Sequence, residues 1–220
     1  LMTSNRKTDF KTSDFIRSMI YAQVLNPGSK LSAFENVIPN IYGARTFSYD
    51  QILDEIEYIG SDYQKYIECF NHGIELNWHR NTKKAFFDCT NYYFKIDLED
   101  DLRRKRPSKE NRKSPIIGQA LMLDAEQVPI AMERYPGNES EKPYLRKTVE
   151  DRKSRYDISS KIIEVADKGL NCAKNIYYLH KEGKDGYIFS KSFKRKSLSR
   201  AEKEWIALDN DDQLWKEVED

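Results

Sequence analysis

Hydrophobic residues follow two different periods along the chain, and the change between them divides it. Up to about residue 80, apolar residues recur three or four positions apart, which is the spacing of helices with one buried face. From residue 85 onward, short apolar and aromatic runs predict strands, with two helical segments among the later ones. The pattern therefore predicts a mostly helical region followed by a region of mixed α and β structure.

Three helices are predicted in the first region. The first covers residues 14–24, and the second begins at a capping box formed by Ser48 and Gln51. A similar pattern at Ser61 and Gln64 predicts the start of the third helix. The region contains no catalytic grouping, so a small DNA-binding region and a plain helical packing unit both fit it.

The stretch 85–94 is aromatic and β-prone, and an acid, Asp88, interrupts it. A carboxylate held against bulky apolar neighbours has to be paired, protonated or bound to a metal, because desolvating it alone is costly. We therefore expect Asp88 to be buried with a partner. Alternation along the strand places Asp88 on one face together with Phe86, Thr90, Tyr92 and Phe94.

A second strand-like run, residues 161–166, ends directly before another acid, Asp167. Two acids carried by buried-looking strands suggest a metal site at a sheet, although an aspartate at a strand end is more often a turn or cap residue. Between the two runs lies a predicted hairpin of residues 115–124 and 127–134. The remaining predicted elements are a helix at 141–152, a helix at 172–182 and a strand at 186–190.

Three strands, a helix, a strand, a helix and a strand are the element order of a ribonuclease-H-like fold. This α/β fold has a mixed sheet flanked by helices, and its first and fourth strands are neighbours. In such a sheet Asp88 and Asp167 converge.

The formal net charge is only +1, so any contact with nucleic acid must come from a local cluster of basic residues. The densest cluster covers residues 103–113 and is expected to be an exposed loop. Such a run is usually a solvated surface, but its position after an acid-bearing strand favours contact with phosphates. The candidates for DNA binding are Arg103, Arg104, Lys105, Arg106, Lys109, Arg112 and Lys113.

Several other chemistries find no support in the sequence. The three cysteines lie far apart, and the three histidines lack zinc-type spacing. A nucleophile elbow and a glycine-rich phosphate loop are also missing. Because no apolar run is long enough for a membrane span or a signal peptide, we expect a soluble cytoplasmic protein with no membrane partner.

Four stretches, in order, resemble the DDE transposases of bacterial insertion sequences, in the branch with a ribonuclease-H-like domain. Residues 24–31 extend the likeness upstream, and it covers most of the chain up to about residue 195. The four stretches are 87–94, 108–112 with 115–117, 136–141 and 165–170.

The resemblance implies a specific chemistry. Asp88 and Asp167 would be the first two acids of a catalytic triad that binds Mg²⁺ or Mn²⁺ in a two-metal site. Metal-activated water would hydrolyse the DNA strand at the element's end, and the freed 3′-hydroxyl would attack target DNA. Thr90, Asn138 and Glu141 would support this site. Transposases of this kind usually work as homodimers on paired ends, although no residue here indicates a dimer surface.

One part of the family's pattern is missing. Its third acid is a glutamate within Tyr-x-x-Arg-x-x-x-Glu, and no such pattern follows Asp167. We therefore expect a truncated transposase whose strand cleavage is low or absent, or else an inactive DNA-binding remnant or a ribonuclease-H-like nuclease. The expected divisions are a helical region at 1–82, an incomplete catalytic domain at 83–198 and the start of an inserted or C-terminal segment at 199–220.

Overall fold

A computed structural model describes most of the chain, and it forms two compact units, Leu1–His72 and Gly73–Asp220. The boundary falls within a helix, about ten residues before the boundary at 82 that the sequence suggests. The described residues are 10–43, 46–78, 80–106, 114–156, 161–182, 185–191 and 199–200.

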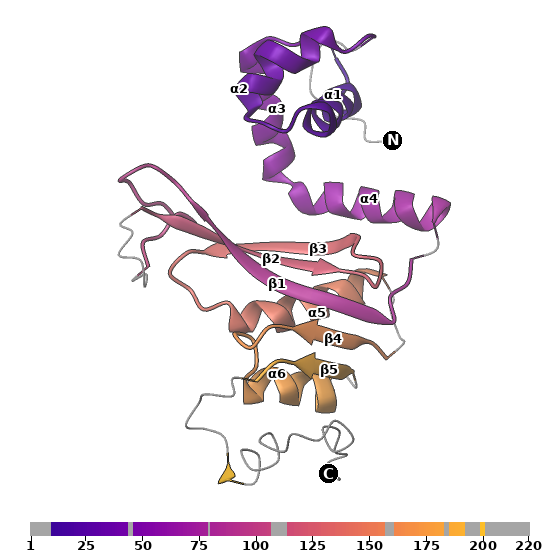
Figure 1. Cartoon of the computed structure of the whole chain (residues 1–220), viewed down its shortest axis with the longest axis vertical. Coiled ribbons are helices and arrows are strands. Elements are labelled where there is room, and N and C mark those ends of the chain that lie inside the picture. Colours follow the sequence, from indigo (N-terminus) through magenta and orange to yellow (C-terminus); the bar gives the residue numbers. More distant parts are fainter. Residues whose placement is uncertain are drawn as a thin grey trace. The chain divides into compact units, whose positions relative to one another are not determined.

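The N-terminal unit is entirely helical among the residues that the structure describes (Figure 1). Its core is aromatic, with Phe10 and Phe15 each meeting the ring of Phe47 edge-on. No helix in the described part of the chain is long and apolar enough to cross a membrane. The helices are α1 (Thr12–Leu25), α2 (Lys30–Ser32), the π-helix η1 (Ala33–Val37), the 3₁₀-helix η2 (Ile38–Asn40), α3 (Tyr49–Ser61) and α4 (Tyr63–Asn77), the last of which crosses into the second unit.

One of the two predicted capping boxes is confirmed and the other is wrong. The Gln51 backbone N–H donates to the Ser48 hydroxyl at 3.1 Å, and the Ser48 backbone N–H donates to the Gln51 side chain at 2.9 Å. Ser61 instead donates its hydroxyl to the carbonyl oxygen of Tyr58 at 2.7 Å. It therefore belongs to the last turn of α3, because its side chain is used within that helix and does not cap α4.

The second unit is built on a five-stranded sheet in the order β3-β2-β1-β4-β5. The first three strands are antiparallel to their sequence neighbours, and β4 and β5 run parallel to β1. The pairing of β1 with β4 confirms the predicted ribonuclease-H-like arrangement. The strands are β1 (Lys84–Tyr93), β2 (Ile116–Leu123), β3 (Pro129–Pro136), β4 (Ile163–Ala166) and β5 (Gly186–Phe189).

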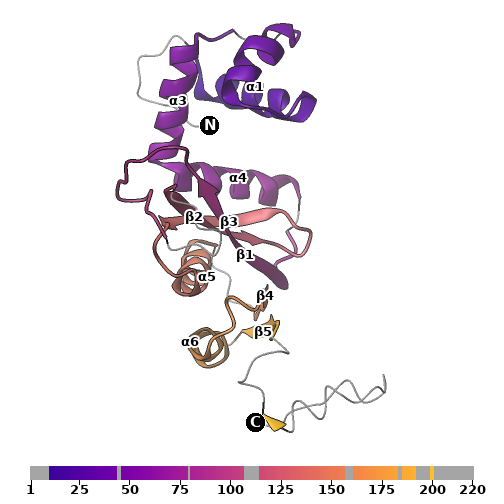
Figure 2. The same ribbon diagram turned by 60° about the vertical axis from the view of Figure 1, so that its left-hand side comes forward.

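Helices α5 (Lys142–Tyr156) and α6 (Ala173–Tyr177), the latter continued by the π-helix η3 (Tyr178–Glu182), lie on the same side of this sheet (Figures 1 and 2). Leu145 and Val149 of α5 are fully buried against it. The strands alternate accordingly, with every second residue turned into this core. The core-facing strand residues include Ala85, Phe87, Ala120, Met122, Ile162 and Ala166.

Candidate active site

The two predicted acids lie on neighbouring strands at matching positions. In the parallel pairing of β1 with β4, Phe86 is opposite Val165 and Phe87 is opposite Ala166. The pairing ends there, and the next residue of each strand is an acid, Asp88 after Phe87 and Asp167 after Ala166. Partners in a parallel ladder point to the same face, and adjacent strands lie about 4.8 Å apart. Continued by one residue, this register aligns Asp88 with Asp167 on one face of the sheet.

This face is the one opposite the helical core, and here the expectation for Asp88 was wrong in part. Alternation correctly predicted that Asp88 shares a face with Phe86 and Thr90, but both Asp88 and Thr90 are exposed. Helices α5 and α6 pack against the other face, through Ala85 and Phe87. Asp88 is hydrated, so it needs no buried partner. Its Oδ1 accepts a hydrogen bond from the Cys89 backbone N–H at 2.8 Å.

Asp167 follows β4 directly and is also exposed. Hydrogen bonds from the Lys168 backbone N–H and from the Ser190 hydroxyl lower the pKa of its carboxyl group. The Ser190 Oγ lies 3.1 Å from Asp167 Oδ1. The Leu170 N–H donates to the Asp167 carbonyl at 3.0 Å, so this residue also opens a turn. The carboxylate is thus fixed in its charged form at the edge of the site.

The donor set suits a hard divalent cation. Two exposed carboxylates on one face offer oxygen ligands only, which is what Mg²⁺ and Mn²⁺ prefer. Mg²⁺ is commonly held by one or two carboxylates together with substrate phosphates and water. Within the described ranges, no group of three or more acidic, histidine or cysteine side chains is placed to hold a metal. A metal ion held by Asp88 and Asp167 would therefore need further ligands, such as water or a phosphate.

The three residues predicted to support the site differ in their positions. Glu141 precedes α5, and its Oε1 would lie only 2.7 Å from a Cβ at Gly169, so it borders the turn after Asp167. Because Gly169 has no Cβ, it leaves room for this carboxylate. Thr90 lies on the open face two residues beyond Asp88. Asn138 is exposed in the turn after β3, and no described contact joins it to either acid.

The basic run has fewer available charges than its sequence indicates. Arg103 forms an ion pair with Asp100, and Arg104 Nη2 lies 3.9 Å from Asp101 Oδ1. Both pairs are three residues apart and solvent-exposed, so they partly neutralise the start of the run. Lys105 and Arg106 are also described, and neither has an ion pair within the described chain. The predicted residues Lys109, Arg112 and Lys113 lie outside the described residues.

Sequence reasoning missed two features around the acids. The Ser190 hydroxyl carried no signal, because only the pairing of β4 with β5 brings it to Asp167. The second is a fully buried ion pair on the opposite face, where Arg152 Nη2 donates to Glu164 Oε1 at 2.8 Å. Burial raises the pKa of Glu164 to about 7, although Arg152 acts in the opposite direction. The acid inside the run 161–166 was the available signal.

Neither models of known protein families nor curated proteins match this chain. Among solved structures, it is similar to the piggyBac transposase in a synaptic complex with hairpin DNA, with 13% identity, a TM-score of 0.50 and coverage of 91% of this chain. The match covers 46% of that transposase, so the chain spans about half its length. At this identity the likeness shows a shared fold.

Two structures of the Mos1 mariner transposase are also similar. One is a paired-end complex with Mn, with 7% identity, a TM-score of 0.33 and coverage of 85% of this chain and 61% of that chain. The other is a paired-end complex with the left transposon end, with 7% identity, a TM-score of 0.32 and coverage of 86% and 60%. These scores are too low to carry an argument.

Proposed function

We propose that this chain is part of a transposase that cuts and joins DNA strands with divalent metal ions held by Asp88 and Asp167. The observation that carries the proposal is the parallel pairing of β1 with β4, whose last paired residues, Phe87 and Ala166, directly precede the two acids. The shared fold with the piggyBac transposase supports it. The resemblance to transposases of bacterial insertion sequences supports it independently, through the residues around both acids.

The chain's own residues have distinct roles in this proposal. Asp88 and Asp167 would hold Mg²⁺ or Mn²⁺. The bound ion would act as a Lewis acid and would lower the pKa of bound water. The Lys168 N–H and the Ser190 hydroxyl hold Asp167 in its carboxylate form, ready to bind. Glu141 positions the turn that follows Asp167. Thr90 and Asn138 are assigned supporting positions along the path of the DNA.

DNA is the proposed substrate, and a homodimer on paired ends is the proposed assembly. The piggyBac structure is a synaptic complex with hairpin DNA, which favours this kind of partner. Arg103 to Arg106, followed by Lys109, Arg112 and Lys113, are the proposed phosphate contacts beside the site. Lys105 and Arg106 should contribute most among the first four, because Arg103 and Arg104 already have carboxylate partners.

A second candidate function is DNA binding without cleavage. It is favoured by the small number of candidate ligands, since no group of three or more acidic, histidine or cysteine side chains is placed to hold a metal in the part of the chain that the structure describes. Two acids hold a metal weakly unless a phosphate completes the shell. The two candidates therefore share the DNA-binding surface and differ in whether strands are cut.

Metal binding can be tested without relying on activity. We expect Mn²⁺ to broaden the backbone NMR signals of Cys89 and Lys168 first, because these residues flank the two acids. Asp88→Asn and Asp167→Asn should each abolish the selective broadening and any Mn²⁺-dependent nicking of supercoiled DNA. Asp97→Asn, which removes an exposed acid beyond β1, is the matched control and should change neither.

Selective broadening that persists in both Asp88→Asn and Asp167→Asn would remove these acids from the metal site and overturn the proposal. Broadening that is lost as expected, with no nicking by the unmodified chain, would favour the second candidate. Nicking that is lost in either variant and retained in Asp97→Asn would favour the first.

A further inference from the structure

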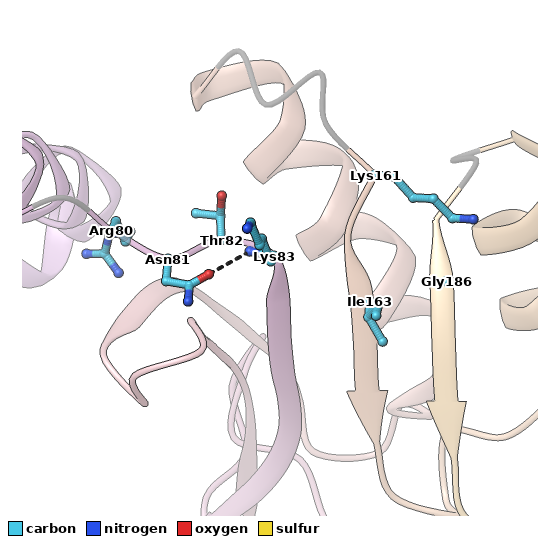
Figure 3. A pocket seen from close by; sticks show the side chains of 7 residues that line it. All are labelled: Arg80, Asn81, Thr82, Lys83, Lys161, Ile163 and Gly186. Carbon is cyan, nitrogen blue, oxygen red and sulfur yellow. Dashed lines mark hydrogen bonds between the residues drawn. The ribbon is translucent and has the colours of Figure 1, made fainter.

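A pocket of about 880 Å³ lies where β1, β4 and β5 begin, at the opposite end of the strands from Asp167 (Figure 3). Ile163 and Gly186, the first residues of β4 and β5, line part of it. Its rim is polar and carries three basic side chains. The lining residues are 80–83 together with Lys161, Ile163 and Gly186.

The rim carries positive charge that is not neutralised locally. Arg80 is held in place by Asp124, with Nη1 2.9 Å from Oδ2, and it also donates to the carbonyls of Val128 and Pro129. Lys83 and Lys161 are both exposed, and neither ammonium group has an ion-pair partner among the residues that the structure describes. Arg80 is therefore structural, and the two lysines remain available for a ligand.

The nearest acid does not cancel this charge. Asp185 lies directly before Gly186 and is buried, with only 2% of its surface exposed. Its Oδ1 accepts from the Ile162 N–H at 3.1 Å, and its Oδ2 forms an ion pair with Lys153. No described lining residue of the pocket is acidic. The pocket thus favours an anion.

The backbone that carries the lysines is firmly held. The Lys83 N–H donates to the Asn81 side chain at 3.2 Å, and the Asn81 carbonyl accepts from the Ala125 N–H at 3.1 Å. The Lys83 carbonyl accepts from the Ile163 N–H at 3.1 Å, which joins the starts of β1 and β4. Lys83 and Lys161 precede the adjacent strands β1 and β4 and are offset by one register position, and in Figure 3 the Lys161 side chain extends toward Gly186. Their flexible side chains can therefore contact separate phosphates along a DNA backbone.

We propose that this pocket binds the phosphate backbone of DNA at a second position, away from the acid pair. The inference rests on the proposed function, since DNA is the polyanion that the chain would hold. Lys161 precedes Asp167 by six residues, an even number, so alternation places both on the open face, about 20 Å apart. That distance equals about six base pairs of DNA, at about 3.4 Å per pair. DNA lying along the strands would thus meet the pocket and the acids together.

The test measures how the affinity for DNA depends on salt. A fluorescent 30-base-pair duplex is titrated with the full chain in EDTA between 50 and 300 mM salt, using anisotropy. The double variant Lys83→Gln/Lys161→Gln should lower the slope of log K against log salt by about 2, since each lost phosphate contact removes about 0.9. If the double variant and the unmodified chain bind DNA equally at 1 M salt, the double variant should bind roughly 60-fold more weakly than the unmodified chain at 0.1 M salt.

The control is Lys142→Gln/Lys174→Gln, which removes two exposed lysines from α5 and α6 and changes the net charge equally. It should leave the slope within about 0.5 of the unmodified chain. Melting temperatures within about 2 °C of each other establish that all variants are folded.

Equal slopes for the pocket variant and the control would overturn the inference, and so would a chain that binds no duplex at all. The proposed function fails separately, when Mn²⁺ broadening persists in both Asp88→Asn and Asp167→Asn. Because the slope is measured in EDTA, a chain without metal chemistry still yields the expected change if the pocket binds DNA.

Discussion

The buried Glu164 provides a prediction whose sign depends on which of two opposing effects is larger. Its carboxylate is fully buried on β4 and receives a hydrogen bond from Arg152, which is also fully buried. The nearby negative charge of Asp185 raises the pKa of Glu164, and the positive charge of Lys153 lowers it. Burial penalises the charged carboxylate more than Arg152 stabilises it, so the pKa rises from 4.5 to about 7. The proposed perturbation is Glu164→Gln, which mimics the protonated side chain.

The raised pKa makes the folded protein bind more protons than the unfolded chain between pH 4.5 and 7. Glu164 therefore favours the folded state fully below pH 4.5, and this contribution is lost as the pH rises through 7. The shift of about 2.5 pKa units corresponds to roughly 3 kcal/mol, at about 1.4 kcal/mol per unit. Most of this loss falls between pH 5 and 8.

The assay is urea unfolding at pH 5 and pH 8. The unmodified chain should lose roughly 2.5 kcal/mol more than Glu164→Gln between these values, because glutamine has no charge to bury. Glu150→Gln, which changes an exposed glutamate on α5, is the control and should follow the unmodified chain. A Glu164→Gln variant that is less stable than the unmodified chain at pH 8, yet equal to it at pH 5, would mean that attraction to Arg152 is the larger effect. That result would refute the reasoning.

Two further predictions concern the acid-bearing strands and the sheet. Ser190→Ala should raise the pKa of Asp167 toward its ordinary range without fully restoring it, because the hydrogen bond from Lys168 remains. NMR titration of the Asp167 carboxyl group measures this change, and an unchanged pKa would contradict the role assigned to the Ser190 hydroxyl. Gly118→Ala should destabilise the second unit by about 1–3 kcal/mol, because a Cβ there would lie 2.0 Å from the Tyr135 ring. The control is Gly73→Ala in α4, where an added Cβ would meet no heavy atom within 4 Å. This variant should raise helix stability by about 0.5–1 kcal/mol, and similar thermal melts for the two variants would refute the clash at Gly118.

The order of strands and helices could be predicted because each element carries its own local signal. The aromatic run 85–94 became β1 at Lys84–Tyr93, and the two apolar runs around residue 125 became the hairpin of β2 and β3. Period-two alternation also assigned Asp88 to the correct set of residues on its strand. These predictions succeed because side-chain direction in a strand depends only on position.

Which face of the sheet is covered could not be predicted in the same way. Phe86 and Tyr92 are as bulky as Phe87, so composition did not reveal that Ala85 and Phe87 form the core side. That choice depends on where α5 and α6 pack, which is a tertiary property. The same limit explains Ser61, whose spacing from Gln64 fits a capping box while its hydroxyl is used within α3. Where one helix follows another after a single residue, a capping pattern does not show whether the residue ends the first helix or begins the second.

The buried ion pair and the exposed acids are connected through β4. Glu164 and Asp167 are three residues apart, so they point to opposite faces of the sheet, one into the core and one toward solvent. A slip of one residue would exchange these faces and would also move Asp167 out of line with Asp88. Arg152 opposes such a slip, because it would be left buried without its carboxylate partner. Pairing with Arg152 therefore supports the register of this four-residue strand, and the alignment of the two candidate metal ligands depends on that register.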